Sequence, residues 1–238
     1  MDEFDRTKQY FENHAEDYAE TIMAIQPLLY KNMGKIINRN VSDGDNVLDI
    51  GNGGIVNYDY KRMNRLVCAD LYVSELAQKK YKDEDNVDFV KGDILNLTQE
   101  ESLRGYKPDV IIVQTVIHHL ARGTYRDTVA NVEKAIRECM EMLECGGRLV
   151  ILESTVTAWF EKIERIMYPL MQLFFRVCKF GAVYQFSSKS LYRLISNMGL
   201  EIKESEEVEL DKYVWIMNCK VSSKLTPCGL TYYLIEKK

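Results

Sequence analysis

Acidic side chains stand at the ends of three short apolar runs in the first half of the chain. Asp49 lies near the end of the first run, Asp70 directly follows the second, and Asp93 comes shortly after the third. Parallel strands end at one edge of a sheet, and ligands bind in the crevice beyond that edge. We therefore predict that the three carboxylates converge on a ligand that carries ribose hydroxyls. The simpler alternative is that Asp49 and Asp93 cap turns or helices, where Asp is favoured.

A glycine-rich turn follows the first run, which reads VLDIGNGG over residues 47–54. Glycine lets a ligand approach the backbone closely. An enzyme that binds a nicotinamide dinucleotide uses the pattern G-x-G-x-x-G, whose third glycine would fall at Val56. A Cβ at that position crowds the helix against the strand. The sequence therefore disfavours a dehydrogenase.

Two adjacent histidines, His118 and His119, directly follow the fourth apolar run and belong to the same predicted edge of the sheet. Histidine is the side chain best matched to proton transfer near neutral pH. We predict that one or both act as a catalytic base toward a hydroxyl or ammonium substrate. The alternative is that one ring caps a helix or bonds a backbone carbonyl.

The elements that must position these residues are short β-prone runs that alternate with helical stretches. This alternation is typical of βαβ units and a parallel sheet. Between the fourth and fifth runs, apolar residues recur at helical spacing and a Cys145-Gly146-Gly147 turn ends the helix. The candidate strands are Asn46 to Ile50, Leu66 to Ala69, Val87 to Val90, Asp109 to Gln114, Arg148 to Glu153, Glu201 to Val208, Tyr213 to Cys219 and Tyr232 to Glu236.

These elements fit one α/β domain over residues 1–238, with a Rossmann-like, seven-stranded, mostly parallel sheet flanked by helices. A single hydrophobic core can still form at this length. Residues 1–40 form a predicted N-terminal helical cap, in which two helices over Arg6 to Ile37 break near Pro27.

A helical insertion over residues 154–185 follows the fifth strand, at the end of the sheet where insertions usually shape substrate pockets. Apolar residues recur there every three or four positions, and Pro169 is expected to bend the helix. Glu153 and Trp159 are candidate substrate-binding residues, although Glu153 also suits a helix cap or an ion pair. The helix is apolar over more than one face, which leaves three explanations open: a lid over an apolar substrate, a dimer surface, or shallow membrane contact.

Taken in order, these motifs resemble the class I S-adenosylmethionine-dependent methyltransferases. The resemblance runs from about Tyr10 to Gly199 and is carried by VLDIGNGG, the strand end Val67 to Asp70, VKGDI, DVIIVQTVIHHL and LECGGRLVILE. The family's usual G-x-G-x-G motif is altered here, because Ile55 stands at the third glycine position and Gly54 comes one place early. This indicates a reshaped loop.

The resemblance implies S-adenosyl-L-methionine as the cofactor and methyl transfer as the reaction. It also implies roles for residues that match the family's motifs. Gly51 and Gly53 would line the amino-acid end of the cofactor, with Asp49 organising the loop. The other implied contacts are Asp70 to the ribose diol, Leu71 to the adenine face, Asp93 with the Ile94 backbone to the adenine amine, and Gln114 and Tyr18 to the methionine portion.

Aromatic residues of the N-terminal cap are also candidates, since aromatic faces attract cations such as a sulfonium. Tyr10 is predicted to contact the substrate as part of a lid, and stapling of the cap to the sheet is the alternative reading for these residues. The methyl acceptor is predicted to be a small, apolar organic molecule, with O-, N- or C-methylation left open. A non-methylating protein that keeps the fold is the competing function.

The composition of the chain disfavours several classes of binding partner. Thirty-one basic and 36 acidic residues give a formal charge of -5, and no basic block suggests a surface for nucleic-acid phosphates. The start of the chain has no secretory pattern and no run is long enough for stable membrane insertion, so we expect a cytoplasmic protein. With three histidines and no Cys-x-x-Cys pair, no metal is expected. A homodimer remains open.

Overall fold

A computed structural model describes residues 21–178, 181–216 and 219–238. Its helices and strands follow the chain in the order α2 (Pro27–Asn40), β1 (Asn46–Ile50), β2 (Arg65–Asp70), α3 (Glu75–Lys80), β3 (Val87–Lys91), β4 (Val110–Gln114), α4 (Tyr125–Met142), β5 (Arg148–Val156), α5 (Ala158–Cys178), α6 (Ser188–Asn197), β6 (Ile202–Glu207), β7 (Tyr213–Ile216), β8 (Cys219–Ser222) and β9 (Cys228–Glu236). Short 3-10 helices lie at Tyr60–Arg62, Leu97–Gln99, Glu101–Leu103, Ile117–Leu120 and Ser223–Leu225.

A seven-stranded sheet forms the centre of the molecule, in the order β3-β2-β1-β4-β5-β9-β6. The first five strands pair in parallel, and β9 runs antiparallel between β5 and β6. This confirms the predicted Rossmann-like, mostly parallel sheet. The strand order reverses between β1 and β4, and such a switch point opens a crevice at the carboxyl ends of the strands.

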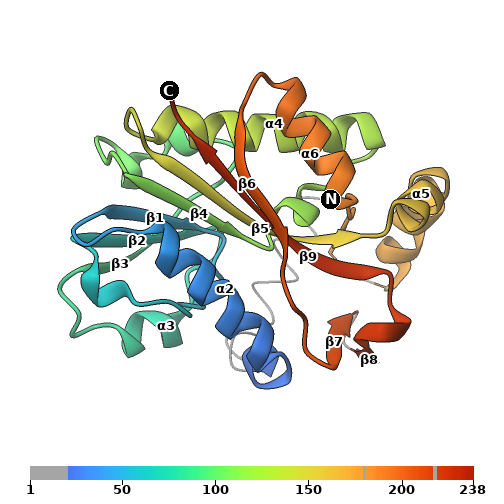
Figure 1. The fold of residues 1–238 in the computed structure, drawn as a ribbon, viewed down its shortest axis with the longest axis horizontal. Coiled ribbons are helices and arrows are strands. Elements are labelled where there is room, and N and C mark those ends of the chain that lie inside the picture. Colours follow the sequence, from blue (N-terminus) through green and yellow to red (C-terminus); the bar gives the residue numbers. More distant parts are fainter. Residues whose placement is uncertain (1–20, 179–180, 217–218) are drawn as a thin grey trace.

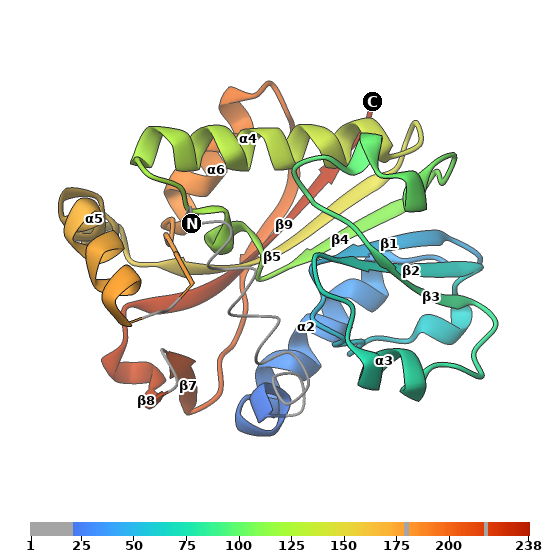
Figure 2. The same ribbon diagram turned by 180° about the vertical axis from the view of Figure 1, so that it is seen from behind.

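Helices cover both faces of this sheet (Figures 1 and 2). The buried residues of α4 and α6 join one core cluster, while those of α2 join a second cluster on the opposite face. Side chains alternate between faces along a strand. Because Val47 of β1 and Ile112 of β4 pack in the α2 cluster, the neighbouring alternate positions Asp49 and Gln114 belong to that same face.

The N-terminal helical region breaks where proline predicted it. Residues 21–25 are helical, and α2 begins at Pro27, a position where a missing N–H costs the helix nothing. The helix lies close to the loop that follows β1. A Cβ at Gly34 of α2 would come within 2.0 Å of the backbone oxygen of Asn57. This close approach fixes how α2 sits over the sheet.

Three predicted strands differ clearly from the structure. The single strand expected from Tyr213 to Cys219 is instead a hairpin, in which β7 and β8 pair with each other and form a separate small sheet. The fifth strand continues to Val156, three residues beyond the predicted end, because β9 begins early and pairs with it from Cys228 onward. The helix of the insertion therefore starts at Ala158 and continues through Pro169.

The contact of Gly34 predicts the effect of adding one methyl group there. Gly34→Ala should lower the free energy of unfolding by about 1–3 kcal/mol, because the new Cβ must push α2 away from the Asn57 backbone. Urea unfolding measures the change. Lys35→Ala on the neighbouring, exposed position of the helix is the control and should change stability little; equal stability of the two variants would contradict the contact.

Candidate active site

The loop after β1 lies against the turn after β4. Gly51, Gly53 and Gly54 have φ angles of +70°, +56° and +80°, a region that residues with a Cβ rarely adopt. A Cβ on Gly51 would also come within 2.5 Å of the Val116 side chain. The glycines therefore let two loops from adjacent strands meet at the switch point. Ile55, at the family's third glycine position, is buried in the α2 cluster.

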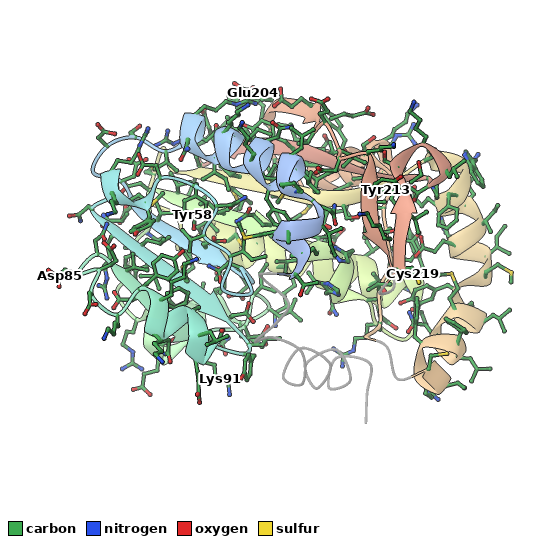
Figure 3. All side chains as sticks on the ribbon, turned by 90° about the horizontal axis from the view of Figure 1, so that it is seen from below. Tyr58, Asp85, Lys91, Glu204, Tyr213 and Cys219 are labelled. Atoms are coloured by element: carbon green, nitrogen blue, oxygen red, sulfur yellow. The ribbon has the colours of Figure 1, made fainter. Side chains whose placement is uncertain are left out.

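A carboxylate, Asp49, is buried at the end of β1 beneath this loop. The Tyr58 hydroxyl donates to its Oδ2 at 2.6 Å, and Gln114 Nε2 lies 3.4 Å from the same oxygen. Figure 3 shows Tyr58 on the side of the sheet that α2 covers. Burial raises the pKa of Asp49 to about 7, even though the bond from Tyr58 favours the ionised form.

Asp70 at the end of β2 joins the glycine loop to the second strand. Its Oδ2 accepts from the Gly53 N–H at 3.1 Å and its Oδ1 from the Tyr72 N–H at 3.1 Å. Burial raises the pKa of this carboxyl group, and the backbone donors oppose that rise. Each carboxylate oxygen has two acceptor positions, so capacity remains for further donors.

Beneath the glycine loop, at the ends of β1 and β4, two of the buried acceptor atoms that lack a donor among the described residues lie on neighbouring strands. These atoms are Asp49 Oδ1 and Gln114 Oε1. A buried acceptor left without a donor costs free energy, and a bound ligand or water is the usual explanation. A ligand with N–H or O–H groups at this point would satisfy both, so the residues fit a polar, donor-bearing group of a cofactor.

The remaining predicted cofactor residues have mixed surroundings. Asp93 accepts from the Leu95 N–H at 2.9 Å and from the Asn96 side chain at 2.7 Å, so its carboxylate also stabilises its own turn. The adjacent Gly92 N–H donates to the Asp70 carbonyl. Ile94 is buried and Leu71 is partly exposed. Tyr10 and Tyr18 lie outside the described residues.

His118 and Glu153 form a pair across the ends of β4 and β5. His118 Nδ1 lies 2.6 Å from Glu153 Oε1. Glu153 also accepts from the Ile117 N–H at 2.6 Å and the Ser154 N–H at 2.7 Å, which holds the buried carboxylate rigidly. A neutral ring that donates from Nδ1 keeps its lone pair on Nε2. The arrangement is that of a base oriented by a carboxylate.

His119 lies against the other ring, with 3.9 Å between the two ring centres. Burial lowers its pKa well below the ordinary value, and the neighbouring His118 lowers it further. His119 is therefore neutral near pH 7. Of the two predicted bases, the carboxylate contact distinguishes His118.

Trp159, unlike these buried groups, is exposed. It is 60% exposed at the start of α5 and packs edge-on against Phe160. The sequence reasoning missed Tyr58 and Glu164. Glu164 is buried on the inner face of α5, and burial raises its pKa to about 7. An acid within an apolar helical pattern was the available signal for Glu164, whereas Tyr58 lies in an irregular loop and had none.

Comparison with known proteins finds a family model that covers part of the chain. Residues 48–151 match the family model described as a methyltransferase domain. This match supports the resemblance to the class I S-adenosylmethionine-dependent methyltransferases that the sequence motifs indicate. The matched residues include the last three residues of β1, the glycine loop, Asp70 and both histidines. The resemblance implies S-adenosyl-L-methionine as the cofactor.

Solved structures share the fold of the methyltransferase at low sequence identity. The N-methyltransferase NodS from Bradyrhizobium japonicum WM9, in complex with S-adenosyl-L-homocysteine, is 16% identical with a TM-score of 0.64, and 98% of each chain is covered. A chain of the complex between the Haloferax volcanii Trm112 methyltransferase activator and a putative methyltransferase is 14% identical, with a TM-score of 0.63 and 98% of each chain covered. The [4+2]-cyclase SpnF is 12% identical, with a TM-score of 0.58 and coverage of 97% and 96%. No curated protein matches the chain in sequence.

Within the described ranges, no three His, Cys, Asp or Glu side chains gather in a way that could hold a metal ion. In the same part of the chain, none of the helices is both long and apolar enough to cross a bilayer.

The raised pKa of Asp49 predicts a pH dependence of stability in the ligand-free protein. Between about pH 4 and 7, the folded methyltransferase keeps a proton that the unfolded chain has released, so stability falls as the pH rises through this window. This effect should lower the free energy of unfolding of the wild type by about 2–3 kcal/mol between pH 5 and pH 8, and Asp49→Asn should remove that decrease. Urea unfolding at both pH values measures it. Asp85→Asn, at an exposed position, should keep the wild-type slope; an unchanged slope in Asp49→Asn would show that Asp49 does not titrate there.

Proposed function

We propose that this methyltransferase acts in the cytoplasm on a small, apolar organic acceptor and that His118 removes the proton of the attacking group. The observation that carries the proposal is the 2.6 Å contact between His118 Nδ1 and Glu153. It leaves Nε2 as the basic nitrogen. Val116, two residues before His118, packs against Gly51, so the base belongs to the same turn that borders the cofactor loop.

The cofactor contacts remain part of this proposal. Asp70 would accept from the ribose diol, and Gly51 and Gly53 would lie along the amino-acid end. The unsatisfied oxygens Asp49 Oδ1 and Gln114 Oε1 support this placement, because the ammonium group of the methionine portion carries three N–H donors. Leu71, Asp93 and Ile94 would surround the adenine, and Tyr18 would approach the methionine end.

S-adenosylmethionine, when bound, supplies a methyl group on a sulfonium, and displacement there requires an in-line nucleophile. The protein's part is to hold the acceptor, exclude water and accept a proton. Glu153 fixes the ring of His118, and His118 Nε2 takes the proton of a hydroxyl or ammonium acceptor. Because His119 is held neutral, it adds no positive charge beside the site of transfer.

The insertion over residues 154–185 would shape the acceptor pocket. Tyr184 donates its backbone N–H to the His118 carbonyl at 2.9 Å, which ties this segment to the base. The rings of Tyr125, Tyr168 and Phe186 surround the Tyr184 ring at centroid distances of 4.8–5.5 Å. These rings belong to the buried core, and an aromatic cluster beside the base would suit a flat, apolar acceptor.

Polar atoms also lie near this aromatic cluster. Glu164 Oε2 and the Tyr184 hydroxyl are buried without a hydrogen-bond partner among the described residues. A polar group on an otherwise apolar acceptor would supply those bonds. This supports Glu164 and Tyr184 as acceptor contacts beside Glu153, with Tyr10 and Trp159 as the contacts expected from sequence.

The role of Asp70 can be tested by calorimetry. Asp70→Ala should weaken S-adenosylmethionine binding about 10–100-fold, because hydrogen bonds to a charged carboxylate contribute about 1.5–3 kcal/mol. Asp88→Ala on the neighbouring strand β3 is the control and should bind as the wild type does. Equal affinity in both variants would remove Asp70 from the cofactor site.

The base proposal can be tested by methyl transfer from labelled cofactor to a metabolite extract, followed by mass spectrometry. His118→Gln should slow transfer about 10²–10⁴-fold with unchanged cofactor affinity, as expected for loss of a general base. Glu153→Gln should slow transfer less, because the ring keeps a weaker partner. His119→Gln is the matched control, and an equal loss in that variant would contradict the assignment to His118.

The alternative function is that of a cofactor-binding protein that does not methylate. The similarity of this chain's fold to the [4+2]-cyclase SpnF is the observation that favours it. The two functions separate in one assay. Wild-type protein that binds S-adenosylmethionine yet methylates nothing in the extract would support the alternative, whereas a labelled product lost in His118→Gln supports methyl transfer.

A further inference from the structure

Helix α5 is oriented with its apolar stripe toward the outside. Eight of the twelve exposed large hydrophobic residues in the described part of the chain belong to this helix, with exposed fractions of 41–78%. They are Trp159, Ile163, Ile166, Met167, Leu170, Leu173, Phe174 and Val177. We call this set the outer stripe. Figures 1 and 2 show α5 at one end of the molecule, and Figure 3 shows side chains projecting from it away from the body.

The inner face of α5 is largely polar, and specific bonds hold it in place. Glu161 Oε2 accepts from the hydroxyls of Ser187 and Ser190, each at 2.6 Å. The Tyr168 hydroxyl donates to the Arg122 carbonyl at 2.8 Å and lies 2.9 Å from the Thr128 hydroxyl. Rotation of the helix to bury its apolar side would break these bonds, so the outward stripe follows from the fold.

The exposed charges of α5 are all of one sign. Lys162, Arg165 and Arg176 are exposed, whereas the only two acids of the helix, Glu161 and Glu164, are buried. This surface is basic although the whole chain carries a formal charge of -5. An apolar stripe flanked by basic residues with no exposed acid matches the composition of helices that lie in the surface of an anionic bilayer.

A second segment extends this surface. The 3-10 helix Ser223–Leu225 joins β8 to β9 and lies at the same end of the molecule as α5 in both views (Figures 1 and 2). Leu225 is 83% exposed and Lys224 is also exposed. The apolar and basic character of the outer stripe therefore continues onto a separate element.

We propose that α5 docks the protein peripherally on anionic phospholipid, with the helix axis in the plane of the bilayer surface. At 21 residues the helix is about 30 Å long, and its outer stripe would enter the boundary between headgroups and acyl chains while the basic side chains meet lipid phosphates. A second copy of the chain fits less well, because its α5 would offer the exposed basic side chains no exposed acid to pair with. The proposal does not depend on the methyl acceptor or on His118.

Vesicle co-sedimentation tests this docking with the full chain. Vesicles of phosphatidylcholine alone are compared with vesicles of phosphatidylcholine and phosphatidylglycerol. The wild type should bind the anionic vesicles at least about tenfold better than the neutral ones, and added salt should weaken this binding. Binding to neither vesicle, or equally to both, overturns the proposal.

Matched variants separate the apolar and the charge contributions. Ile166→Ser with Val177→Ser should reduce binding to anionic vesicles about tenfold or more, whereas Leu76→Ser, at an exposed apolar position of α3, should not. Lys162→Gln with Arg176→Gln should reduce it as well, compared with Lys31→Gln and Lys35→Gln on α2 as the charge control. Thermal melts establish that each variant is folded.

Light scattering after size-exclusion chromatography tests whether a second copy of the chain, and not a bilayer, covers the outer stripe. A monomer mass with lipid binding supports docking on the bilayer. A dimer that the double serine variant converts to monomer, without lipid binding by the wild type, assigns the outer stripe to a contact between copies and overturns the proposal. Cofactor binding measured in parallel should be unchanged in all variants, so failure of this proposal is distinct from failure of the proposed function.

Discussion

The buried carboxylate of Asp49 connects the parts of the structure that form the site. It sits at the end of β1, next to the point where the strand order reverses, and its partners come from the following loop through Tyr58 and from β4 through Gln114. Tyr58 in turn follows Asn57, whose backbone contacts Gly34 of α2. One acidic side chain thus links a helix, a loop and two strands at the crevice.

The burial of this group has a cost that explains its surroundings. Taking a carboxylate out of water favours its neutral form, which is why the pKa rises. The hydrogen bond from Tyr58 offsets part of that cost, and the unsatisfied Oδ1 leaves the remainder for a ligand to offset. A site of this kind is less stable alone than when occupied, and ligand binding then stabilises the fold by mass action.

The residues proposed for the two chemical roles lie on opposite faces of the same sheet edge. Asp49 and Gln114 belong to the α2 face, whereas Glu153 follows Leu149 and Ile151 of β5 toward the α4 face. The proposed base and the glycine loop, on opposite faces, meet only at the edge, where β4 ends and the chain turns. Thr115 makes that turn with a φ of 53°, an uncommon conformation for a β-branched residue. The strain at Thr115 is consistent with a constraint imposed by this meeting of loops.

Local patterns were enough to predict the sheet, because each parallel strand is a short apolar run bounded by turn residues. The predicted Asn46 to Ile50 coincides with β1. The prediction of a single strand from Tyr213 to Cys219 was wrong, and the structure has the hairpin of β7 and β8 there. Pairing between strands, and not propensity along the chain, decides where a strand ends. The contact of His118 with Glu153 spans 35 residues, and the one from Tyr58 to Asp49 depends on an irregular loop. Spacing along the chain carries no information about either.

Helix α5 shows the limit of periodicity most directly. The period of apolar residues correctly indicated a helix, but periodicity does not say which face is inside, and the usual inference that the apolar stripe packs on the core was reversed by four polar residues. Glu161, Glu164, Tyr168 and Gln172 repeat with the same spacing and are buried. Burial of a polar group costs less where a partner meets it. Ser187, Ser190, Thr128 and the Gln185 backbone provide such partners for Glu161, Tyr168 and one oxygen of Glu164, whereas the amide of Gln172 has none among the described residues. The side chains of the outer stripe are 41–78% exposed, so each forgoes a part of the about 1.5–3 kcal/mol that full burial contributes. An apolar partner that covers the outer stripe would therefore stabilise this orientation of α5.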